Sequence, residues 1–232
     1  MKQLVVLGGG ESGVGAALLG QQQGYRVLVS DKSLIKQAFK NVLIQHEIKW
    51  EEGGHNEAAV MDASLVVKSP GIPDTVPLVL ALRVAGIKVI DEVEFASYYT
   101  KATLIGITGS NGKTTTTMLI YHILKSEGYA VKMGGNIGVS FAGLVYESLI
   151  KGAAPIDYYV LELSSFQLDN IENFRPHIAV ITNISPDHLD RYGYDMERYT
   201  AAKFRIAKNQ TSANYLIYDA DCPVIQTAMS QQ

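Results

Sequence analysis

A glycine-rich loop between an apolar run and a helix-like run is the feature that most restricts the fold of this chain. The loop reads GITGSNGKTTT from Gly106 to Thr116; it ends a strand expected at 103–107 and opens a helix expected at 113–126. Such a strand, loop and helix N-terminus form a cradle for phosphate, because backbone N–H groups and the helix dipole converge on phosphate oxygens. The motif therefore predicts a phosphate-loop (P-loop) mononucleotide-binding α/β domain.

Two side chains of this loop carry the expected chemistry. Lys113 would reach the β- and γ-phosphates of ATP, and Thr114 would place its hydroxyl on Mg²⁺. The general pattern G-x-x-x-x-G-K-[ST] has glycine where this chain has Ile107, so an ordinary glycine-rich turn before a helix is the alternative. The residues expected to bind ATP are Gly109, Ser110, Asn111, Gly112, Lys113, Thr114 and Thr115.

A second glycine motif opens the chain. Gly8, Gly10 and Gly13 follow a strand expected at 3–7 and satisfy G-x-G-x-x-G. The next expected strand ends at Asp31, near where a ribose-binding acid is expected in a dinucleotide site. The motif by itself leaves three interpretations open: an NAD(P) site, a site for another nucleotide, and a tight turn without a ligand.

Composition narrows the class of protein. The chain has 232 residues, 47% of them hydrophobic and 19% charged, which is typical of a globular protein with a substantial core. A formal net charge of −3 and the lack of a long basic run argue against a nucleic-acid partner. The single cysteine fits a reducing compartment, and no apolar run approaches the length of a signal-peptide core or a membrane span. We therefore expect a cytoplasmic protein with no membrane partner.

Strand-like and helix-like segments alternate along the chain, which predicts an α/β fold with doubly wound parallel sheets. We expect a Rossmann-like domain at 1–97 and a P-loop α/β domain at 98–232 that is truncated. The remaining expected strands lie at 26–30, 64–68, 87–90, 158–163, 178–182 and 215–218, and the remaining helices at 13–22, 33–40, 77–85 and about 196–208.

Polar residues follow three of these strands at their carboxyl ends, where ligands of parallel sheets bind. They are the turn Ser69–Pro73, the acid Glu162 and the Pro-Asp-His loop with His188. Glu162 could hold Mg²⁺ opposite the loop threonine, and His188 could handle metal or phosphate. The alternatives are a plain Pro-Gly turn, a surface acid and a structural histidine. The other histidines have no such setting and are interpreted as structural or surface residues: His46, His55, His122 and His177.

Four blocks are specific enough to compare with a known family. They are GITGSNGKT at 106–114, GNIG at 135–138, ELSSFQL at 162–168 and NISPDHLDR at 183–191. Together they resemble the Mur ligases of peptidoglycan synthesis, and most of all the members that add D-glutamate to UDP-N-acetylmuramoyl-L-alanine. The resemblance covers essentially the whole chain and implies that the opening glycine loop holds the UDP of the substrate.

The resemblance also implies roles for individual residues. Lys113 and Thr114 would bind ATP and Mg²⁺, with Glu162 as a ligand of the first of two Mg²⁺ ions and His188 as a ligand of the second. Lys203 would react with CO₂ to form a metal-coordinating carbamate, although its pattern alone indicates an exposed helical lysine. Lys113, His188 and Lys203 are thus the expected catalytic residues. UDP-N-acetylmuramoyl-L-alanine would contact Ser12, Gly13, Asp31, Lys32, Ser69, Gly71, Asn136 and Gln167.

The implied reaction is ATP-dependent amide bond formation. The alanyl carboxylate would attack the γ-phosphate to give an acyl phosphate, and the amine of D-glutamate would then displace phosphate. Family members are much longer and monomeric, so we expect an N-terminal half that lacks the D-glutamate domain and binds without turnover.

Two other functions remain as alternatives. An NAD(P)-dependent oxidoreductase could be built on the first glycine motif, but it leaves the P-loop and the Pro-Asp-His block unexplained. A non-catalytic nucleotide-binding or regulatory module is the third hypothesis.

Overall fold

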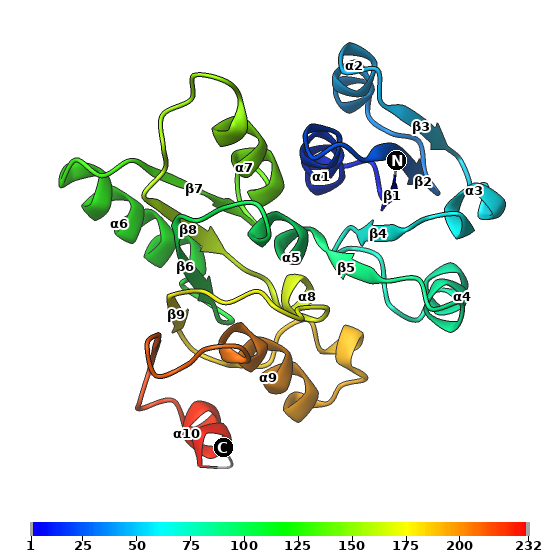
Figure 1. Cartoon of the computed structure of the whole chain (residues 1–232). Coiled ribbons are helices and arrows are strands. Elements are labelled where there is room, and N and C mark those ends of the chain that lie inside the picture. Colours follow the sequence, from blue (N-terminus) through cyan, green and yellow to red (C-terminus); the bar gives the residue numbers. More distant parts are fainter. Residues whose placement is uncertain (1, 231–232) are drawn as a thin grey trace. The chain divides into compact units, whose positions relative to one another are not determined.

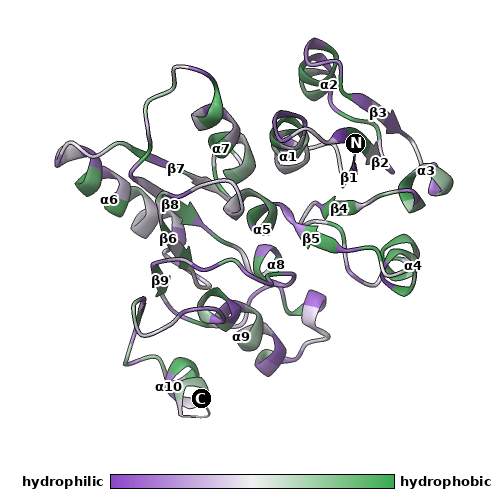
Figure 2. Cartoon of the chain, viewed as in Figure 1, coloured by the Kyte–Doolittle hydropathy of each residue, from purple (hydrophilic) through white to green (hydrophobic). Residues whose placement is uncertain are grey.

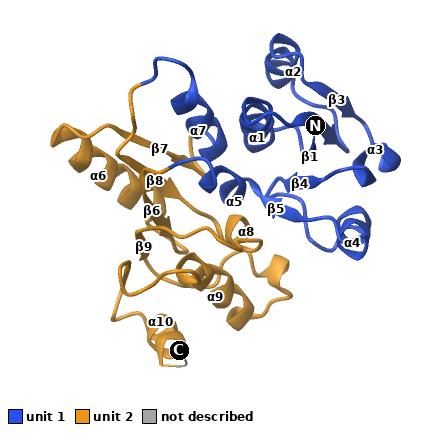
Figure 3. Cartoon of the chain, viewed as in Figure 1, with its two compact units in different colours: residues 1–100, 139–153 blue, residues 101–138, 154–232 orange. Residues whose placement is uncertain are grey.

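The computed structural model describes residues 2–230, whose helices and strands are labelled in Figure 1. The chain forms two compact units, which Figure 3 distinguishes by colour. Unit 1 contains the residues up to Thr100 together with Val139–Ala153, and unit 2 contains Lys101–Gly138 together with the residues from Ala154 onward. The chain thus returns to unit 1 after the P-loop helix, a feature that a single boundary near residue 97 does not describe.

Unit 1 is built on a five-stranded parallel sheet in the order β3-β2-β1-β4-β5. Its strands are β1 (Gln3–Leu7), β2 (Arg26–Asp31), β3 (Lys49–Glu52), β4 (Leu65–Lys68) and β5 (Val89–Asp91). Its helices are α1 (Glu11–Gln22), α2 (Gln37–Gln45), α3 (Glu57–Met61), α4 (Pro77–Val84), α5 (Glu92–Ser97) and α7 (Phe141–Leu149).

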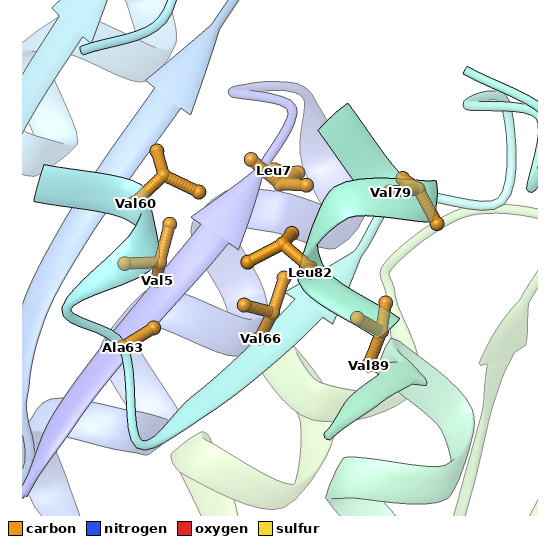
Figure 4. Close-up of a cluster of buried hydrophobic side chains, with 8 residues drawn as sticks. All are labelled: Val5, Leu7, Val60, Ala63, Val66, Val79, Leu82 and Val89. Atoms are coloured by element: carbon orange, nitrogen blue, oxygen red, sulfur yellow. The ribbon is translucent and has the colours of Figure 1, made fainter. Parts of the chain in front are cut away.

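Alternation along β1 explains how helices cover both faces of this sheet. Val5 and Leu7 point to one face, where side chains of α3 and α4 pack on them (Figure 4). Leu4 points to the other face, where it contacts α1 at Gly20. Full burial of each such side chain stabilises the fold by about 1.5–3 kcal/mol. The buried cluster in Figure 4 comprises Val5, Leu7, Val60, Ala63, Val66, Val79, Leu82 and Val89.

The edge strand β3 was not predicted from the sequence. It reads Lys49-Trp-Glu-Glu52 and is hydrophilic in Figure 2, whereas β4 is hydrophobic. Among the strands of residues 2–230 it pairs with β2 alone, where Leu28 is the partner of Lys49. An edge strand needs little apolar surface, and its charges discourage pairing with another sheet, so no hydrophobic alternation marks it.

Unit 2 contains a second five-stranded parallel sheet, in the order β10-β9-β6-β8-β7. Its strands are β6 (Thr103–Thr108), β7 (Val131–Gly135), β8 (Tyr158–Glu162), β9 (Ile178–Ile181) and β10 (Tyr215–Tyr218). Its helices are α6 (Lys113–Ser126), α8 (Ser165–Leu168), α9 (Met196–Phe204), α10 (Pro223–Met229) and the 3₁₀ turns η1 (Leu189–Tyr192) and η2 (Arg205–Ala207).

Helices cover both faces of this sheet as well. Ile105 and Ile107 of β6 pack against Ile120 of α6. Gly106 lies between them in sequence and faces the opposite side, where it contacts Ile206 of η2. Two parallel sheets of this kind confirm the predicted α/β class.

Several predicted boundaries were wrong. A helix was expected at 33–40, but α2 begins only at Gln37. The backbone N–H of Ser33 donates to Asp31, and that of Ile35 donates to the carboxylate of Glu52, which holds this segment outside the helix. The helix expected at about 196–208 ends at Phe204 and continues as a 3₁₀ turn. β7 and α7 had not been predicted.

Candidate functional site

The phosphate loop joins the buried strand β6 to α6 and has the backbone that its glycines require. Gly109 has φ +145°, and Gly112, the N-cap of α6, has φ +79° and ψ −3°. A Cβ at Gly109 would also overlap the hydroxyl of Thr182. Only glycine satisfies both conditions at position 109, so the loop can pass close to the end of β9 and reach the N-terminus of α6.

Hydrogen bonds to the segment after β9 fix the shape of this loop. The backbone N–H of Ser110 donates to the Asn183 carbonyl at 2.9 Å, and that of Asn111 donates to the Asn183 side chain at 3.0 Å. The hydroxyl of Thr182 donates to the Asn111 carbonyl at 2.6 Å, and the hydroxyl of Ser110 donates to the Ser185 carbonyl at 2.8 Å. The loop is therefore held from one side by residues 182–185.

The Lys113 side chain folds back over the loop that precedes it. Its ammonium group donates to the carbonyl oxygens of Gly109 at 3.0 Å and Ser110 at 2.9 Å. This places a positive charge at the loop and beside the N-terminus of α6, where anionic groups are stabilised.

A buried carboxylate lies next to the first turn of α6. The Thr114 hydroxyl donates to Glu162 Oε2 at 2.6 Å, and the Asn136 amide donates to Glu162 Oε1 at 3.0 Å. Glu162 is only 2% exposed. A hydroxyl and a carboxylate oxygen side by side match the oxygen ligands that Mg²⁺ prefers. Within residues 2–230 no group of three or more His, Cys, Asp or Glu side chains could hold a metal by itself. A cation here would draw part of its coordination from phosphate oxygens or water.

Lys203 of α9 is buried at the same loop. It is 2% exposed, and its Nζ donates to the Gly109 carbonyl at 2.7 Å. The ammonium also lies 4.5 Å from the centre of the Tyr199 ring. Burial is the main cause that lowers the pKa of Lys203 to about 7, and the charge of Lys113 lowers it further, while Asp187 opposes the shift. The interpretation of Lys203 as an exposed helical lysine, based on pattern alone, was therefore wrong.

His188 has a different setting. It has φ +48°, precedes η1, and its side chain is 66% exposed. Its Nε2 lies 3.7 Å from Asp187 Oδ1, and its ring lies 5.8 Å from that of Phe166. No hydrogen bond in the described part of the chain joins His188 to Thr114 or Glu162, so its metal role stays a prediction.

Unit 1 contains a pocket of about 710 Å³ at the carboxyl ends of its strands. The lining residues come from the carboxyl ends of β1 and β2, the loops after the first four strands, and the first turns of α3 and α4: Leu7, Gly8, Gly10, Asp31, Lys32, Ser33, Gly54, His55, Glu57, Ser69, Gly71, Ile72, Pro73, Val76, Pro77 and Leu78. Asp31, Lys32, Ser69 and Gly71 were predicted to bind substrate, and the structure brings them together here. His55 also lines the pocket, although the sequence interpretation placed it among structural or surface residues.

Two other predicted substrate residues, Ser12 and Gly13, lie in the first turn of α1 and do not line the pocket. A Cβ at Gly13 would overlap the carbonyl oxygen of Gly8. Gly13 therefore has a packing reason to be glycine, because α1 approaches the glycine turn at this point. The contact of either residue with substrate stays a prediction.

Asn136 and Gln167 belong to unit 2, unlike the other predicted substrate residues. Asn136 donates to Glu162. Gln167 is 2% exposed, and its side-chain oxygen accepts hydrogen bonds from Ser164 in a capping box at the start of α8. Their contact with the muramoyl-alanine group stays a prediction as well.

Three residues around the P-loop were not predicted from the sequence. Thr182, Asn183 and Tyr199 support the loop or Lys203, yet none had been singled out. The signal available was the block that begins at Asn183, which was noted only as part of a resemblance. Tyr199 joins the same cluster through its hydroxyl, 3.1 Å from that of Ser110.

The chain is an α/β protein of two units, each built on a parallel sheet. One unit contains the phosphate loop, and the other contains a glycine turn over a pocket. Family models place it further: the Mur ligase middle domain matches residues 107–232, and the Mur ligase MurD-like N-terminal domain matches residues 2–91. The chain belongs to the Mur ligase family, which confirms the family predicted from the sequence.

Relatives and solved structures agree with this assignment. UDP-N-acetylmuramoylalanine–D-glutamate ligases from Christiangramia forsetii and Bacteroides fragilis are 56% and 54% identical, over 95% and 100% of this chain. The alignments cover 48% and 51% of those proteins, so the chain spans about half their length.

UDP-N-acetylmuramate-alanine ligase from Thermotoga maritima has a TM-score of 0.60 at 25% identity, over 98% of this chain and 51% of that one. UDP-N-acetylmuramate:L-alanyl-gamma-D-glutamyl-meso-diaminopimelate ligase from Neisseria meningitides has a TM-score of 0.69 at 19% identity, over 100% of this chain and 75% of that one. At that identity the second likeness shows the fold alone.

The helices within residues 2–230 include none that is both long enough and apolar enough to span a bilayer.

Proposed function

We propose that this chain is the nucleotide-handling half of a ligase that uses ATP to join D-glutamate to UDP-N-acetylmuramoyl-L-alanine. The observation that carries the proposal is the phosphate loop with Lys113, flanked by the buried pair Thr114–Glu162 and by the buried amine of Lys203. The names of the relatives at 54–56% identity support the choice of substrate and amino acid.

In this proposal the loop N–H groups and Lys113 hold the phosphates of ATP. Thr114 and Glu162 hold the first Mg²⁺ ion, and His188 with a modified Lys203 holds the second. Bound Mg²⁺ would neutralise phosphate charge and stabilise the charge that develops during phosphoryl transfer. The oxygen donors of Thr114 and Glu162 support the first ion; the exposure of His188 leaves it accessible for the second.

We propose that Lys203 becomes a carbamate. A neutral amine can attack the carbon of CO₂, and loss of one proton then leaves an N-carboxylate anion. Burial favours this reaction, since the lowered pKa of Lys203, about 7, makes the neutral amine abundant near neutral pH. The product exchanges a cation for an anionic metal ligand beside the phosphate loop.

The reaction would proceed in two displacements. An oxygen of the alanyl carboxylate attacks the γ-phosphorus of ATP, and the bond between the γ-phosphorus and the bridging β-phosphate oxygen breaks. ADP departs, and an acyl phosphate is formed. The amine of D-glutamate then attacks the acyl carbon, phosphate leaves, and the nitrogen loses a proton. Carboxylate and triphosphate are both anionic, so Lys113 acts by concentrating positive charge where they meet.

The two units would divide the binding work. The pocket of unit 1 would hold the UDP group, since Asp31, Lys32, Ser69 and Gly71 line it together with the glycine turn. We assign UDP binding to 1–97 and the N-terminal part of the ATPase domain to 98–232. The P-loop and the Pro-Asp-His block favour this interpretation over an NAD(P)-dependent oxidoreductase, which would use neither.

A chimeric enzyme tests the proposal. Residues 1–232 are joined to the part of the Bacteroides fragilis relative that lies beyond its aligned half, and phosphate release is measured with UDP-N-acetylmuramoyl-L-alanine and Mg·ATP. We expect release that depends on D-glutamate, and none from the 232-residue chain alone, which we propose binds without turnover. A folded chimera without D-glutamate-dependent release would contradict the ligase assignment. Full turnover by the 232-residue chain alone would contradict the proposal that this chain binds without turnover.

A further inference from the structure

A chain of three polar side chains lies under one wall of the unit 1 pocket. The hydroxyl of Ser30, at the end of β2, donates to Glu51 Oε1 at 2.6 Å. The same hydroxyl lies 2.7 Å from Nδ1 of His55, in the loop after β3. Ser30 is fully buried, and Glu51 is further fixed because it accepts the backbone N–H of Asn56 at 2.9 Å.

The hydrogen bonds among Ser30, Glu51 and His55 determine which nitrogen of the His55 ring carries the proton. A carboxylate only accepts hydrogen bonds, and a hydroxyl has one hydrogen to donate. The hydrogen between Ser30 and Glu51 must therefore come from Ser30. The contact with His55 then requires a proton on Nδ1, which donates to Ser30. In a neutral imidazole with Nδ1 protonated, Nε2 carries a lone pair and accepts a hydrogen bond.

His55 is half-buried and is one of the residues that line the pocket. Asp31, another polar residue of the pocket, accepts the backbone N–H groups of Gly9 at 2.7 Å and Ser33 at 2.8 Å. The ring of His55 is thus held by the buried hydroxyl of Ser30, which is itself fixed by the partly buried Glu51.

Topology indicates which part of a nucleotide would meet it. In Rossmann-like sheets the glycine turn after the first strand takes the phosphates, and the end of the second strand takes the ribose. The loop after β3 lies beyond β2 in the strand order, on the side away from β1. The apolar lining from Ile72, Pro73 and Val76 belongs to the loop after β4, on the other side of β1. The ribose at the end of β2 is therefore the part of a nucleotide that the topology places next to the loop of His55.

We propose that His55 is a specificity-determining contact for the nucleoside, and that its Nε2 accepts a hydrogen bond from an N–H or O–H group of uridine. Ser30 and Glu51 act as positioning residues that hold the tautomer. The inference rests on the proposed function, in which this pocket binds the UDP group.

Calorimetry on the 232-residue chain at pH 8, above the range where imidazoles ordinarily titrate, tests the inference with UDP as the probe. We expect His55→Ala to weaken UDP binding roughly tenfold and Ser30→Ala to weaken it by a smaller factor. His55→Gln, which retains an acceptor, should recover part of the loss. His122→Ala is the matched control, because His122 is exposed on α6 of unit 2 and should leave binding unchanged.

Two analogues identify the donor. Cytidine diphosphate lacks the N3–H of uracil, and 2′-deoxyuridine diphosphate lacks one ribose hydroxyl. The wild-type chain should discriminate against one of them, and His55→Ala should abolish that discrimination.

Unchanged UDP affinity in His55→Ala, or weakened affinity with both discriminations intact, would overturn the inference while leaving the proposed function standing. Failure of the folded wild-type chain to bind UDP would instead overturn the proposed function, and the inference with it.

Discussion

The ammonium of Lys203 donates a hydrogen bond to the carbonyl oxygen of Gly109, 2.7 Å away, across 94 residues of sequence. This contact places a buried amine on the phosphate loop, where burial and the charge of Lys113 lower its pKa to about 7. A lysine so placed is suited to carry a proton or a carboxylate beside this loop, and it is poorly suited to be a surface charge.

Replacement of Lys203 tests that role. In the chimeric enzyme we expect Lys203→Ala to lower the rate of phosphate release by roughly 100-fold or more, because an anion that positions charge in the site is lost. Formate or acetate should restore part of the rate, since a free carboxylate can take the place of the carbamate. Lys203→Arg keeps the charge but cannot form the carbamate, so it should stay inactive. A rate close to wild type in Lys203→Ala would return Lys203 to a structural role.

The hydroxyl of Thr114 should contribute to ATP binding only when Mg²⁺ is present. We expect Thr114→Val to weaken ATP binding about tenfold or more with Mg²⁺ and to change it little in EDTA, because the lost group is the hydroxyl proposed to bind metal. Thr114→Ser retains the hydroxyl and serves as the matched control. Calorimetry with ATP under both conditions measures the effect. An equal loss with and without Mg²⁺ would indicate a packing defect instead of a lost ligand.

The raised pKa of Glu92 should make the free energy of unfolding of unit 1 depend on pH. It is 2% exposed at the start of α5 and accepts the backbone N–H of Ala142 in α7. Burial, aided by Asp91 and Glu11 and opposed by the Ala142 hydrogen bond, raises its pKa from 4.5 to about 8.

The folded chain thus retains a proton on Glu92 that the unfolded chain has lost, so this contribution to stability is full below pH 4.5 and falls as pH rises towards 8. The slope of the free energy of unfolding from this one group is at most about 1.4 kcal/mol per pH unit. Urea unfolding of wild type and Glu92→Gln over this pH range isolates the contribution of Glu92 to the free energy of unfolding, because glutamine does not titrate. Parallel pH profiles for the two proteins would contradict the raised pKa.

Much of the fold could be predicted from the sequence, but not all of it. The helix from Lys113 to Ser126 has the predicted bounds, because a loop motif marks its start and an apolar periodic run continues it. The central strands were predicted from β-branched apolar runs. The edge strand β3 and the glycine-containing β7 carry no such pattern, because each is held in the sheet by pairing with a neighbouring strand.

The site was predictable only where a motif marks it. Lys113, Thr114 and Glu162 follow from the P-loop and a strand end, whereas the burial of Lys203 depends on a loop far away in sequence. The role of His55 was not predicted for the same reason, because it lies in the loop after β3 and its partner Ser30 lies on β2. The return of Val139–Ala153 to unit 1 is likewise a tertiary feature, for helix packing decides it and local sequence does not.

Gly13 offers a test of the glycine turn in unit 1. A Cβ there would overlap the carbonyl of Gly8, so we expect Gly13→Ala to destabilise the chain by about 1–3 kcal/mol. Gly10→Ala is the matched control: a Cβ at Gly10 would meet no atom within 4 Å, and its φ of −84° suits alanine. Urea unfolding compares the two variants. Equal stability of both would show that α1 does not approach the turn as closely as described.

A competition titration on the 232-residue chain tests most directly which ligand the unit 1 pocket binds. The chain is titrated with UDP-N-acetylmuramoyl-L-alanine, with NADH, and with the first ligand in the presence of the second. We predict saturable binding of the UDP compound with one site per chain, no binding of NADH, and no competition between them. Tight NADH binding, with no binding of UDP-N-acetylmuramoyl-L-alanine, would contradict the assignment of the unit 1 pocket and with it the proposed ligase function.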